Sequence, residues 1–434
     1  MIKESEETGE TRMIYAKAGK AELEKEKQAL DARYKEYEKM HLSLDMSRGK
    51  PGEAQLALSE GLLTVLNSGE QTVCEGIDCR NYGGFEGLPS LRKIFADLLE
   101  LPEESIFLGN ASSLELMFNT VARHMMFGAY KGATPWSAQG KIRFLCPAPG
   151  YDRHFAISQC MNMELIPVRM TPSGPDMDQV EELVKDEQVK GIWCVPKYSN
   201  PTGITFSDET VRRFADLSPA AKDFRIFWDN AYAIHDLYEE SEPLLNLYTE
   251  LEKRGKTNLA YIFASFSKVT YAGGSVSMMA SGKENMDYAK SIMKNQIICN
   301  DKINQLRHAL FFKDAKGVRA HMKKHAALLR PKFEMVLNTF EKELAPVGVG
   351  RWTKPKGGYF ISLDLPEGTA KRTYELAKNV GVTLTKVGDT FPYGKDPLDQ
   401  NLRIAPSFPS ISDLEKASEV LCFCAKMAAV EKLL

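Results

Sequence analysis

An alternation of two kinds of segment constrains the fold more than any other feature of this sequence. Between about Leu42 and Asp301, apolar runs such as IRFLCPAP, VKGIWCVP, DFRIFWDNAY and LAYIFASFS alternate with helical stretches such as MDQVEELVKDE and DETVRRFADLS. This order is typical of βαβ units with a mostly parallel sheet, so it predicts an α/β fold. Ligands of such sheets bind beyond the carboxyl ends of the strands, where the polar residues of these runs collect.

The two flanking parts of the chain have other patterns. The first segment, up to Met40, predicts one amphipathic helix, because its apolar residues recur at helical intervals, at Leu23, Leu30, Tyr34 and Tyr37. Residues 302–343 predict long helices, one of which Pro331 starts or kinks. Beyond them, GGYFISLDL, VGVTLTKVGD and NLRIAP lie between helical stretches and predict a smaller α+β domain. We expect the N-terminal segment to pack against this domain.

Composition excludes several classes of partner. The chain has 434 residues, 56 Lys and Arg against 58 Asp and Glu, and a formal net charge of -2, which gives no basis for attraction to nucleic acid or to an anionic membrane. No stretch reads as a signal peptide or as a membrane span, so a cytoplasmic location is expected. The eight cysteines lie singly, without C-x-x-C spacing, and predict reduced thiols and no metal site.

Four polar features follow the predicted strands. Lys268 lies in FASFSKVTYAGG, and a lysine near a core is paired, chemically used or at a surface loop. Asn200 begins an Asn-Pro-Thr-Gly turn, and Asp229 ends the run FRIFW, where it is an N-cap or a buried anion. Gly109-Asn-Ala-Ser-Ser-Leu114 precedes a helix, and this helix N-terminus suits a phosphate, although Ser112 also suits a simple N-cap.

In this order, the motifs resemble those of the fold-type I pyridoxal-phosphate enzymes, the aspartate aminotransferase family. The resemblance runs from about Ser47 to Arg403 and is closest to the MocR-like aminotransferase branch, which carries SRGKP, NYGGFEGLPSLR, GNxSSLxLM, PGYDRHF, SNPTG and SKVT. It implies a large domain with a mostly parallel seven-stranded sheet flanked by helices, and a smaller α+β domain. We expect the N-terminal helix and segment in residues 1–54, the cofactor-binding domain in 55–310 and the small domain in 311–434.

The resemblance also implies roles for single residues at the reacting centre. Lys268 would bind pyridoxal phosphate covalently and then move the proton between the substrate Cα and the cofactor, because a partly desolvated lysine has a lowered pKa. Asp229 would pair with the pyridinium nitrogen, supported by His154. Asn200 and Tyr232 would donate hydrogen bonds to the phenolic oxygen of the ring.

The rest of the implied site surrounds these residues. Tyr151 would stack on the ring, and Arg403 would bind the substrate α-carboxylate through a planar pair of donors. Tyr82 resembles the tyrosine that reaches the phosphate of the neighbouring subunit, which implies a homodimer with shared active sites. The phosphate would be bound by Asn110, Ala111, Ser112 and Ser265. One position departs from the usual pattern, since Val276 stands where most of the family has a phosphate-binding arginine.

The activity implied is transfer of an amino group from an L-amino acid, with L-aspartate favoured, to 2-oxoglutarate by a ping-pong mechanism. A second substrate carboxylate needs a cation near Gly49 and Tyr151, and Arg48, Lys50 and Arg153 are the candidates. Lyase, decarboxylase and racemase chemistry remains open, as do aromatic, 2-aminoadipate and kynurenine-type amino donors.

Two other classes fit less well. A nicotinamide dehydrogenase needs a G-x-G-x-x-G turn, and a regulatory protein of the MocR type, which would bind the cofactor without catalysis, adds an N-terminal DNA-binding domain. Neither feature is present in the sequence. His321 and His325 have the spacing of a helical metal pair, but HMKKH lacks the glutamate of H-E-x-x-H, and an exposed basic helix explains it better.

Overall fold

The computed structural model describes residues 14–67 and 72–434. Its centre is an eight-stranded sheet with the order β4-β11-β10-β9-β8-β5-β6-β7. Strands β10, β9, β8, β5 and β6 are parallel to their neighbours in this series, whereas β11 runs antiparallel to β10 and β4. The strands are β4 Ile106–Leu108, β5 Arg143–Ala148, β6 Glu164–Thr171, β7 Gly174–Pro175, β8 Val189–Cys194, β9 Arg225–Asp229, β10 Ala260–Ser265 and β11 Ser277–Ser281.

The predicted α/β class is confirmed, with one more strand than the seven expected. Strand β7 has two residues and pairs antiparallel with the end of β6, so it is too short to leave a periodic pattern in the sequence.

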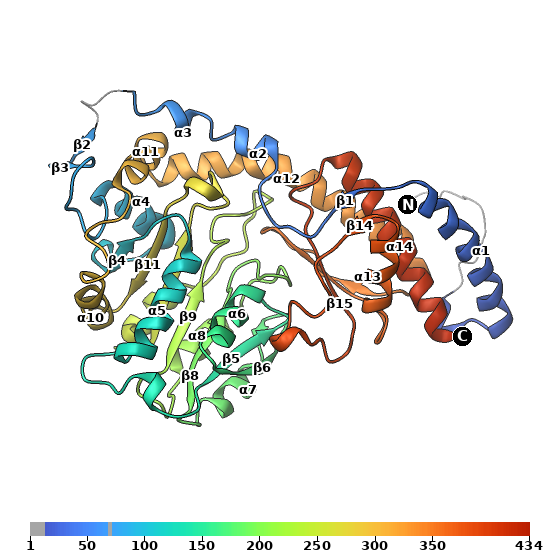
Figure 1. Ribbon diagram of the computed structural model, residues 1–434, viewed down its shortest axis with the longest axis horizontal. Coiled ribbons are helices and arrows are strands. Elements are labelled where there is room, and N and C mark those ends of the chain that lie inside the picture. Colours follow the sequence, from blue (N-terminus) through green and yellow to red (C-terminus); the bar gives the residue numbers. More distant parts are fainter. Residues whose placement is uncertain (1–13, 68–71) are drawn as a thin grey trace, which may run out of the picture.

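Helices cover both faces of this sheet (Figure 1). Helices α5, α6 and α10 pack on one face through residues such as Val121, Phe155 and Met286. The opposite face is covered by α4, α7, α8, α9 and α11. Their bounds are α4 Pro89–Leu99, α5 Ser113–Phe127, α6 Asp152–Cys160, α7 Met177–Leu183, α8 Asp208–Asp216, α9 Leu247–Lys253, α10 Lys283–Met293 and α11 Lys302–Phe312.

The parallel register brings the ends of three strands to one edge. Cys194 of β8 pairs with Trp228 of β9, and Asp229 pairs with Phe263 of β10. The segments that follow these strands therefore leave the sheet side by side, and they carry Asn200, Tyr232 and Lys268.

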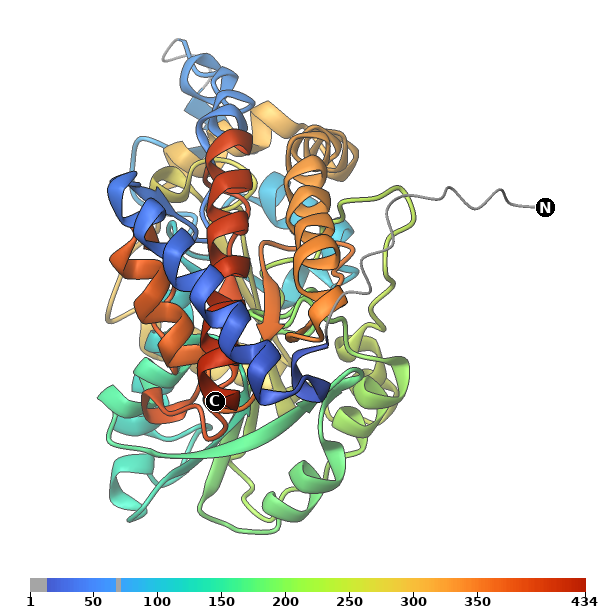
Figure 2. The ribbon, with the colours of Figure 1, turned by 90° about the vertical axis from the view of Figure 1, so that its right-hand side faces the viewer.

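A second core lies at the C-terminal side of the molecule. It combines the three-stranded sheet β12-β13-β15, the parallel pair β1-β14 and helices α1, α13 and α14, which lie in front in Figure 2. Leu23, Leu30 and Tyr37 of α1 are buried here, and the Tyr37 ring lies 5.0 Å from that of Phe423. The predicted N-terminal helix and its packing are confirmed for the described residues, and residues 1–13 lie outside them. The elements are α1 Lys20–Lys39, β1 Leu44–Asp45, β12 Arg351–Trp352, β13 Ile361–Asp364, α13 Ala370–Asn379, β14 Val382–Thr383, β15 Asn401–Ile404 and α14 Ile411–Leu433.

Several short elements connect the longer ones. They are the helices α2 Glu53–Ala57 and α3 Gly61–Thr64, the hairpin β2 Val73–Cys74 and β3 Ile77–Asp78, and the 3₁₀ turns Tyr15–Lys17, Glu103–Ser105, Trp136–Ala138, Thr257–Leu259, Ala272–Gly274, Ala345–Val347 and Pro392–Gly394.

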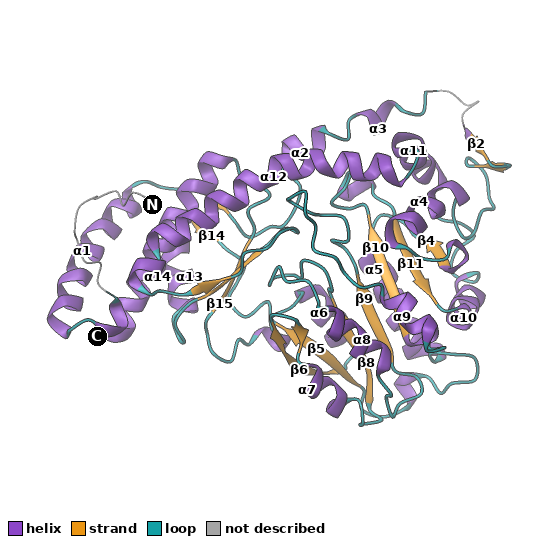
Figure 3. Cartoon of the chain, turned by 180° about the vertical axis from the view of Figure 1, so that it is seen from behind, coloured by secondary structure: helices purple, strands orange, loops and turns teal. Residues whose placement is uncertain are grey.

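Helix α12, Ala315–Glu343, runs from one core to the other (Figure 3). Val318 and Met322 pack in the core of the large sheet, whereas Phe333 and Phe340 pack in the C-terminal core. The helix passes through Pro331 rather than starting there, which corrects that part of the expectation. The domain boundaries at residues 54 and 310 stay a prediction.

The expectation that His321 and His325 lie on an exposed helix was wrong. Both side chains are buried, because they lie one turn apart on the inner side of α12 while Lys323 and Lys324 between them point outward. His325 Nδ1 lies 3.1 Å from Gln55 Nε2, and His321 Nε2 lies 2.9 Å from the carbonyl oxygen of Val269.

Candidate active site

A cavity of about 240 Å³, here called the front cavity, opens at the edge where β8, β9 and β10 end. Its walls come from the start of α5, the Asn200 turn and the segments after β9 and β10. It is lined by Ser112, Ser113, Leu114, Met117, Tyr151, Val195, Asn200, Asp229, Ala231, Tyr232, Ser265, Ser267, Lys268 and Ala272. Seven of the sequence-predicted site residues are therefore brought together: Ser112, Tyr151, Asn200, Asp229, Tyr232, Ser265 and Lys268.

Lys268 offers a free amine to this cavity. Its Nζ lies 5.0 Å from the centroid of the Tyr232 ring and 6.0 Å from that of Tyr359, and among the described residues it has no hydrogen-bond partner. Burial lowers the pKa of Lys268, the Asp229 carboxylate partly offsets this, and the charge of Arg403 lowers the pKa further. A lysine in these surroundings can lose its proton and act as a nucleophile or a base.

Asp229 presents one bound and one unbound oxygen. Oδ2 lies 3.0 Å from Nε2 of His154, whereas Oδ1 is buried without a hydrogen-bond partner. The His154 ring is held by stacking on Trp193 at 4.6 Å and by the edge of Tyr151 at 4.9 Å. Leaving a buried carboxylate oxygen unpaired costs free energy, so the site suits a ligand that brings a donor to Oδ1.

The side chain of Arg403 contacts the Asn200 turn. Its Nη1 donates hydrogen bonds to Asn200 Oδ1 at 3.3 Å and to Asp152 Oδ1 at 3.0 Å. The guanidinium also lies 5.0 Å from the centroid of the Phe360 ring. A Cβ at Gly49 would collide with this ring, so Gly49 contributes to the site by leaving space for Phe360.

Hydroxyl groups gather at the N-terminus of α5. Ser265 Oγ donates to Ser267 Oγ at 3.0 Å, and Ser267 Oγ donates to the Ala111 carbonyl oxygen at 3.0 Å. Ser112 is the N-cap residue of α5 but makes no side-chain capping bond, so its hydroxyl is free for a ligand. Val276 is 1% exposed and buried in the core, so this position supplies no contact to the cavity.

The other predicted residues do not line the front cavity. Arg48 and Lys50 are exposed, and Lys50 Nζ lies 3.8 Å from the centroid of the Phe408 ring. Arg153 points to solvent with its Nε 3.9 Å from Asp152 Oδ2. Asn110 lies at the start of the same turn as Ala111 and bonds to Ser277 and Asp301 instead, and Tyr82 is 76% exposed.

Four contributors were missed by reasoning from the sequence. Ser267 directly precedes Lys268, and its position next to a chemically singled-out lysine was the available signal. Tyr359, whose hydroxyl lies 3.4 Å from the Lys268 carbonyl oxygen, comes from the distant C-terminal core. Trp193 and Asp152 act through His154 and Arg403, and such indirect contacts leave no local sequence pattern.

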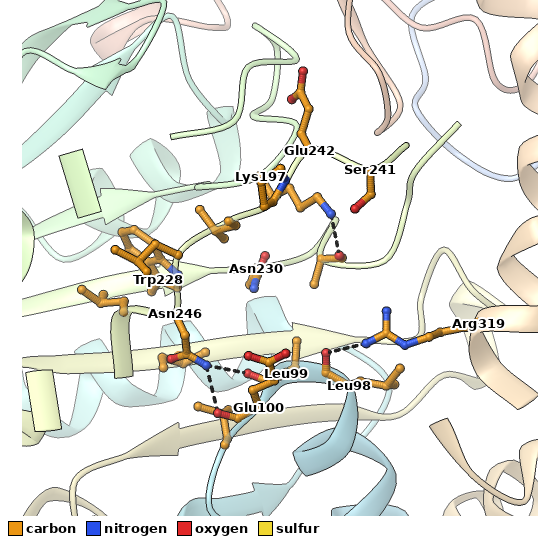
Figure 4. Close-up of a pocket in the computed structure, with 17 residues that line it drawn as sticks. Leu98, Leu99, Glu100, Lys197, Trp228, Asn230, Ser241, Glu242, Asn246 and Arg319 are labelled. Atoms are coloured by element: carbon orange, nitrogen blue, oxygen red, sulfur yellow. Dashed lines mark hydrogen bonds between the residues drawn. The ribbon is translucent and has the colours of Figure 1, made fainter. Parts of the chain in front are cut away.

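A second cavity of about 240 Å³, here called the rear cavity, lies on the other side of β9 (Figure 4). Trp228 and Asn230 line it, and they flank Asp229 on a strand whose successive side chains point to opposite faces. Its lysine, Lys197, donates hydrogen bonds to Asp236 Oδ1 at 2.9 Å and to the Ala233 carbonyl oxygen at 3.1 Å. The rear cavity therefore has a lysine that is paired, unlike Lys268.

Comparison with known families gives a match over nearly the whole chain. A model of the family described as aspartate amino-transferase matches residues 19–434. An aspartate aminotransferase of Corynebacterium glutamicum is 44% identical over 399 residues, which are 92% of this chain and 92% of that protein.

Solved structures have the same architecture. The crystal structure of an aspartate transaminase from Corynebacterium glutamicum matches with a TM-score of 0.95 at 42% identity, over 98% of this chain and 100% of that one. An α-aminoadipate aminotransferase from Thermus thermophilus matches with a TM-score of 0.73 at 19% identity, over 90% of this chain and 94% of that one, which supports the fold alone. In the part of the chain that the structure describes, no helix has the length and apolar character needed to span a bilayer.

Proposed function

The chain belongs to the aspartate aminotransferase family, and on that premise we propose that it transfers the amino group of L-aspartate to 2-oxoglutarate with pyridoxal phosphate as cofactor. It is an aminotransferase with the fold-type I architecture. The single observation that carries the proposal is the meeting of Lys268 and the unpaired Asp229 Oδ1 in one cavity. The narrower MocR-like assignment stays a prediction.

The residues of the front cavity fit pyridoxal phosphate at three points. Asp229 Oδ1 lacks a donor, which the ring nitrogen would supply. Lys268 has a free amine of lowered pKa, which would hold the cofactor covalently. The hydroxyls of Ser112, Ser265 and Ser267 surround the N-terminus of α5, which would hold the phosphate. When bound, the cofactor supplies a ring that withdraws electrons from the substrate Cα.

His154 and the polar groups around the cavity would keep the ring in place. His154 fixes the orientation of Asp229 through Oδ2, which leaves Oδ1 free and would let it accept a hydrogen bond from the ring nitrogen. Asn200 and Tyr232 would contact the ring hydroxyl, and Tyr151 would lie against its face. Burial raises the pKa of Tyr232 well above its usual value, which keeps its hydroxyl a hydrogen-bond donor.

Neutral donors would bind the phosphate. Val276 is buried, so the charge would be met by Ser112, by Ser265 and by the backbone N–H groups at the start of α5 near Asn110 and Ala111. Helix N-termini bind phosphate in this way because several N–H groups and the positive end of the helix dipole point at the anion.

Arg403 and Lys268 would act on different parts of the substrate. The Arg403 guanidinium, held by Asn200 and by the Phe360 ring, would bind the α-carboxylate and so fix which Cα bond faces the ring. Lys268 Nζ would take the proton from Cα, and burial favours this role because it lowers the pKa of the amine. For the second carboxylate of aspartate, Arg48, Lys50 and Arg153 remain the candidate cations, all of them exposed outside the cavity.

We also infer a cytoplasmic homodimer with shared active sites. Tyr82 is 76% exposed and would reach the phosphate site of a second copy. Exposed large apolar side chains on α5, at Phe118, Met126 and Phe127, are of the kind that interfaces cover. All eight cysteines are free thiols, which fits a reducing compartment.

The first test is the absorption spectrum of the purified protein with pyridoxal phosphate. We expect a visible band that disappears on adding L-aspartate without any oxo acid and returns on adding 2-oxoglutarate. A band that no amino acid changes would favour a lyase or a non-catalytic binding protein. The absence of a band with excess cofactor would refute the role of Lys268.

A further inference from the structure

The Arg403 guanidinium already holds a carboxylate that belongs to the chain itself. Nη1 of Arg403 forms an ion pair with Asp152 Oδ1 at 3.0 Å, and the same nitrogen donates to Asn200 Oδ1. The Arg403 side chain is 11% exposed and that of Asp152 is 32% exposed, so solvent screens this pair only in part.

Apart from its favourable place in the first turn of α6, Asp152 makes few contacts besides the one with Arg403. It is the first residue of α6, but the N-cap residue of that helix is Tyr151, and no side chain caps the helix. Among the described residues, the Asp152 side chain makes no hydrogen bond except the one from Arg403. Its other charged neighbour, Arg153, is 3.9 Å away and faces solvent.

In this position, Asp152 competes with a ligand carboxylate for Arg403. A carboxylate binds a guanidinium best through two parallel hydrogen bonds, and Asp152 already takes one of the nitrogens that would form them. A second carboxylate brought to Arg403 would meet the like charge of Asp152 unless that side chain moved away. The charge of Asp152 also acts on Asp389. Burial is the largest cause of the raised pKa of Asp389, and the charge of Asp152 is the next largest.

We propose that Asp152 occupies Arg403 as an internal competitor, lowers the affinity of the site for carboxylates and is displaced by the α-carboxylate of the substrate. The inference rests on the proposed function, because it takes Arg403 as the α-carboxylate group. Amino acids and oxo acids share that carboxylate, so Asp152 weakens the binding of both by the same factor. Proton transfer at Cα does not involve Asp152, so kcat changes little unless product release limits it.

The test replaces Asp152 and measures carboxylate affinity. In Asp152→Asn we expect the KM values for aspartate and 2-oxoglutarate, and the inhibition constants of acetate and succinate, to fall about fivefold, the upper range for a partly exposed ion pair. Asp152→Ala should change them in the same direction. A gain in affinity separates competition from damage, because a merely structural defect would not tighten binding.

Two matched controls separate other causes. Asp208→Asn removes a carboxylate at the same first position of α8, ion-paired with Arg212 at 3.0 Å, and should leave every constant unchanged. Asp389→Asn removes a carboxyl near Arg403 that, among the described residues, makes no hydrogen bond to it, and should give a smaller change than Asp152→Asn.

The outcomes distinguish this inference from the proposed function. Unchanged or weaker inhibition by acetate in both Asp152 variants, with a parental thermal midpoint, would overturn the competition. An equal gain in carboxylate affinity in Asp389→Asn and Asp152→Asn would show that a long-range charge effect, and not competition by Asp152, is the cause. The proposed function fails differently, if Arg403→Gln leaves the acetate inhibition constant unchanged or if the parent protein does not transaminate.

Discussion

Two lysines lie at the same edge of the large sheet, on opposite sides of β9, and their surroundings differ. Lys197 in the rear cavity is 6% exposed and bonded to Asp236 and to a main-chain carbonyl oxygen. Lys268 in the front cavity has a free amine and a lowered pKa. The cavities have the same volume of about 240 Å³, so volume does not mark the site.

The carboxylates of the two cavities differ in the same way as the lysines. Asp236 accepts hydrogen bonds from Lys197 and from the Tyr198 hydroxyl, whereas Asp229 keeps one buried oxygen unpaired. The rear cavity also has an unpaired buried oxygen, Asn230 Oδ1, but it belongs to a neutral amide. The free amine of Lys268 and the unpaired oxygen of Asp229 therefore identify the reactive side of β9, because such buried groups are costly unless a ligand satisfies them.

The largest effect is expected from removing the front lysine. Lys268→Ala should lower transamination at least about 10³-fold, because both the covalent attachment and the proton carrier are lost, while the thermal midpoint stays close to that of the parent. The matched Lys197→Ala should instead cost about 3 kcal/mol of stability, because Asp236 loses its cation, with activity kept in the folded protein. Similar activity losses in both variants would erase the distinction between the cavities.

Removing the Asp229 carboxylate should affect catalysis more than cofactor binding. In Asp229→Ala we expect kcat to fall about 10²–10³-fold while the cofactor stays bound, since the phosphate and Lys268 still hold it. Cofactor content, measured by absorbance after gel filtration, and kcat are the two readings. Asp236→Ala is the matched control variant in the rear cavity. If Asp229→Ala lost the cofactor but had a normal kcat in the fraction that still holds it, the assigned role of Asp229 would be contradicted.

Substrate choice should depend on the three exposed candidate cations and not on the rear cavity. Arg153→Ala, Arg48→Ala or Lys50→Ala should lower the ratio of kcat/KM for aspartate to that for alanine by about fivefold, because a partly exposed cation contributes about 1 kcal/mol to carboxylate binding. Arg319→Ala, in the rear cavity, is the control. An unchanged ratio in all three of these variants would remove the candidates.

The smallest effect concerns stability without cofactor. The pKa of Lys268 is lowered from its usual 10.5, so between the lowered value and 10.5 the unfolded chain binds more protons than the folded one. Stability of the cofactor-free protein should therefore rise with pH through this window, and the cost of burying the charged lysine is fully present below it. Lys268→Met should be about 1 kcal/mol more stable at pH 7 and lose this pH dependence.

Thermal midpoints from pH 7 to 10 measure this effect. Lys197→Met should be destabilised over the same range, because its partner Asp236 is left unpaired. If Lys268→Met were no more stable than the parent at pH 7, burial of Lys268 would cost less than its surroundings indicate.

Much of the site could be predicted from the sequence because its groups follow strands. Lys268, Asp229 and Asn200 each come after an apolar run, and parallel register brings the ends of such runs together. Their convergence in one cavity therefore follows from local patterns and general rules of sheet topology.

The rest depends on contacts that no local pattern encodes. The contact between Arg403 and Asp152 joins residues 251 positions apart, and Tyr359 approaches Lys268 from the other core. The burial of His321 and His325 was misjudged because two lysines between them suggested a solvated helix, whereas helix phase decides which side faces inward.

Helix α12 has a consequence for how the molecule unfolds. Its 29 residues, roughly 44 Å at 1.5 Å per residue, contribute buried side chains to both cores. Neither core can melt completely without exposing apolar surface of a helix that the other core needs in place. The two cores should thus lose their amide hydrogen-exchange protection together, as one cooperative unit, despite having separate sheets.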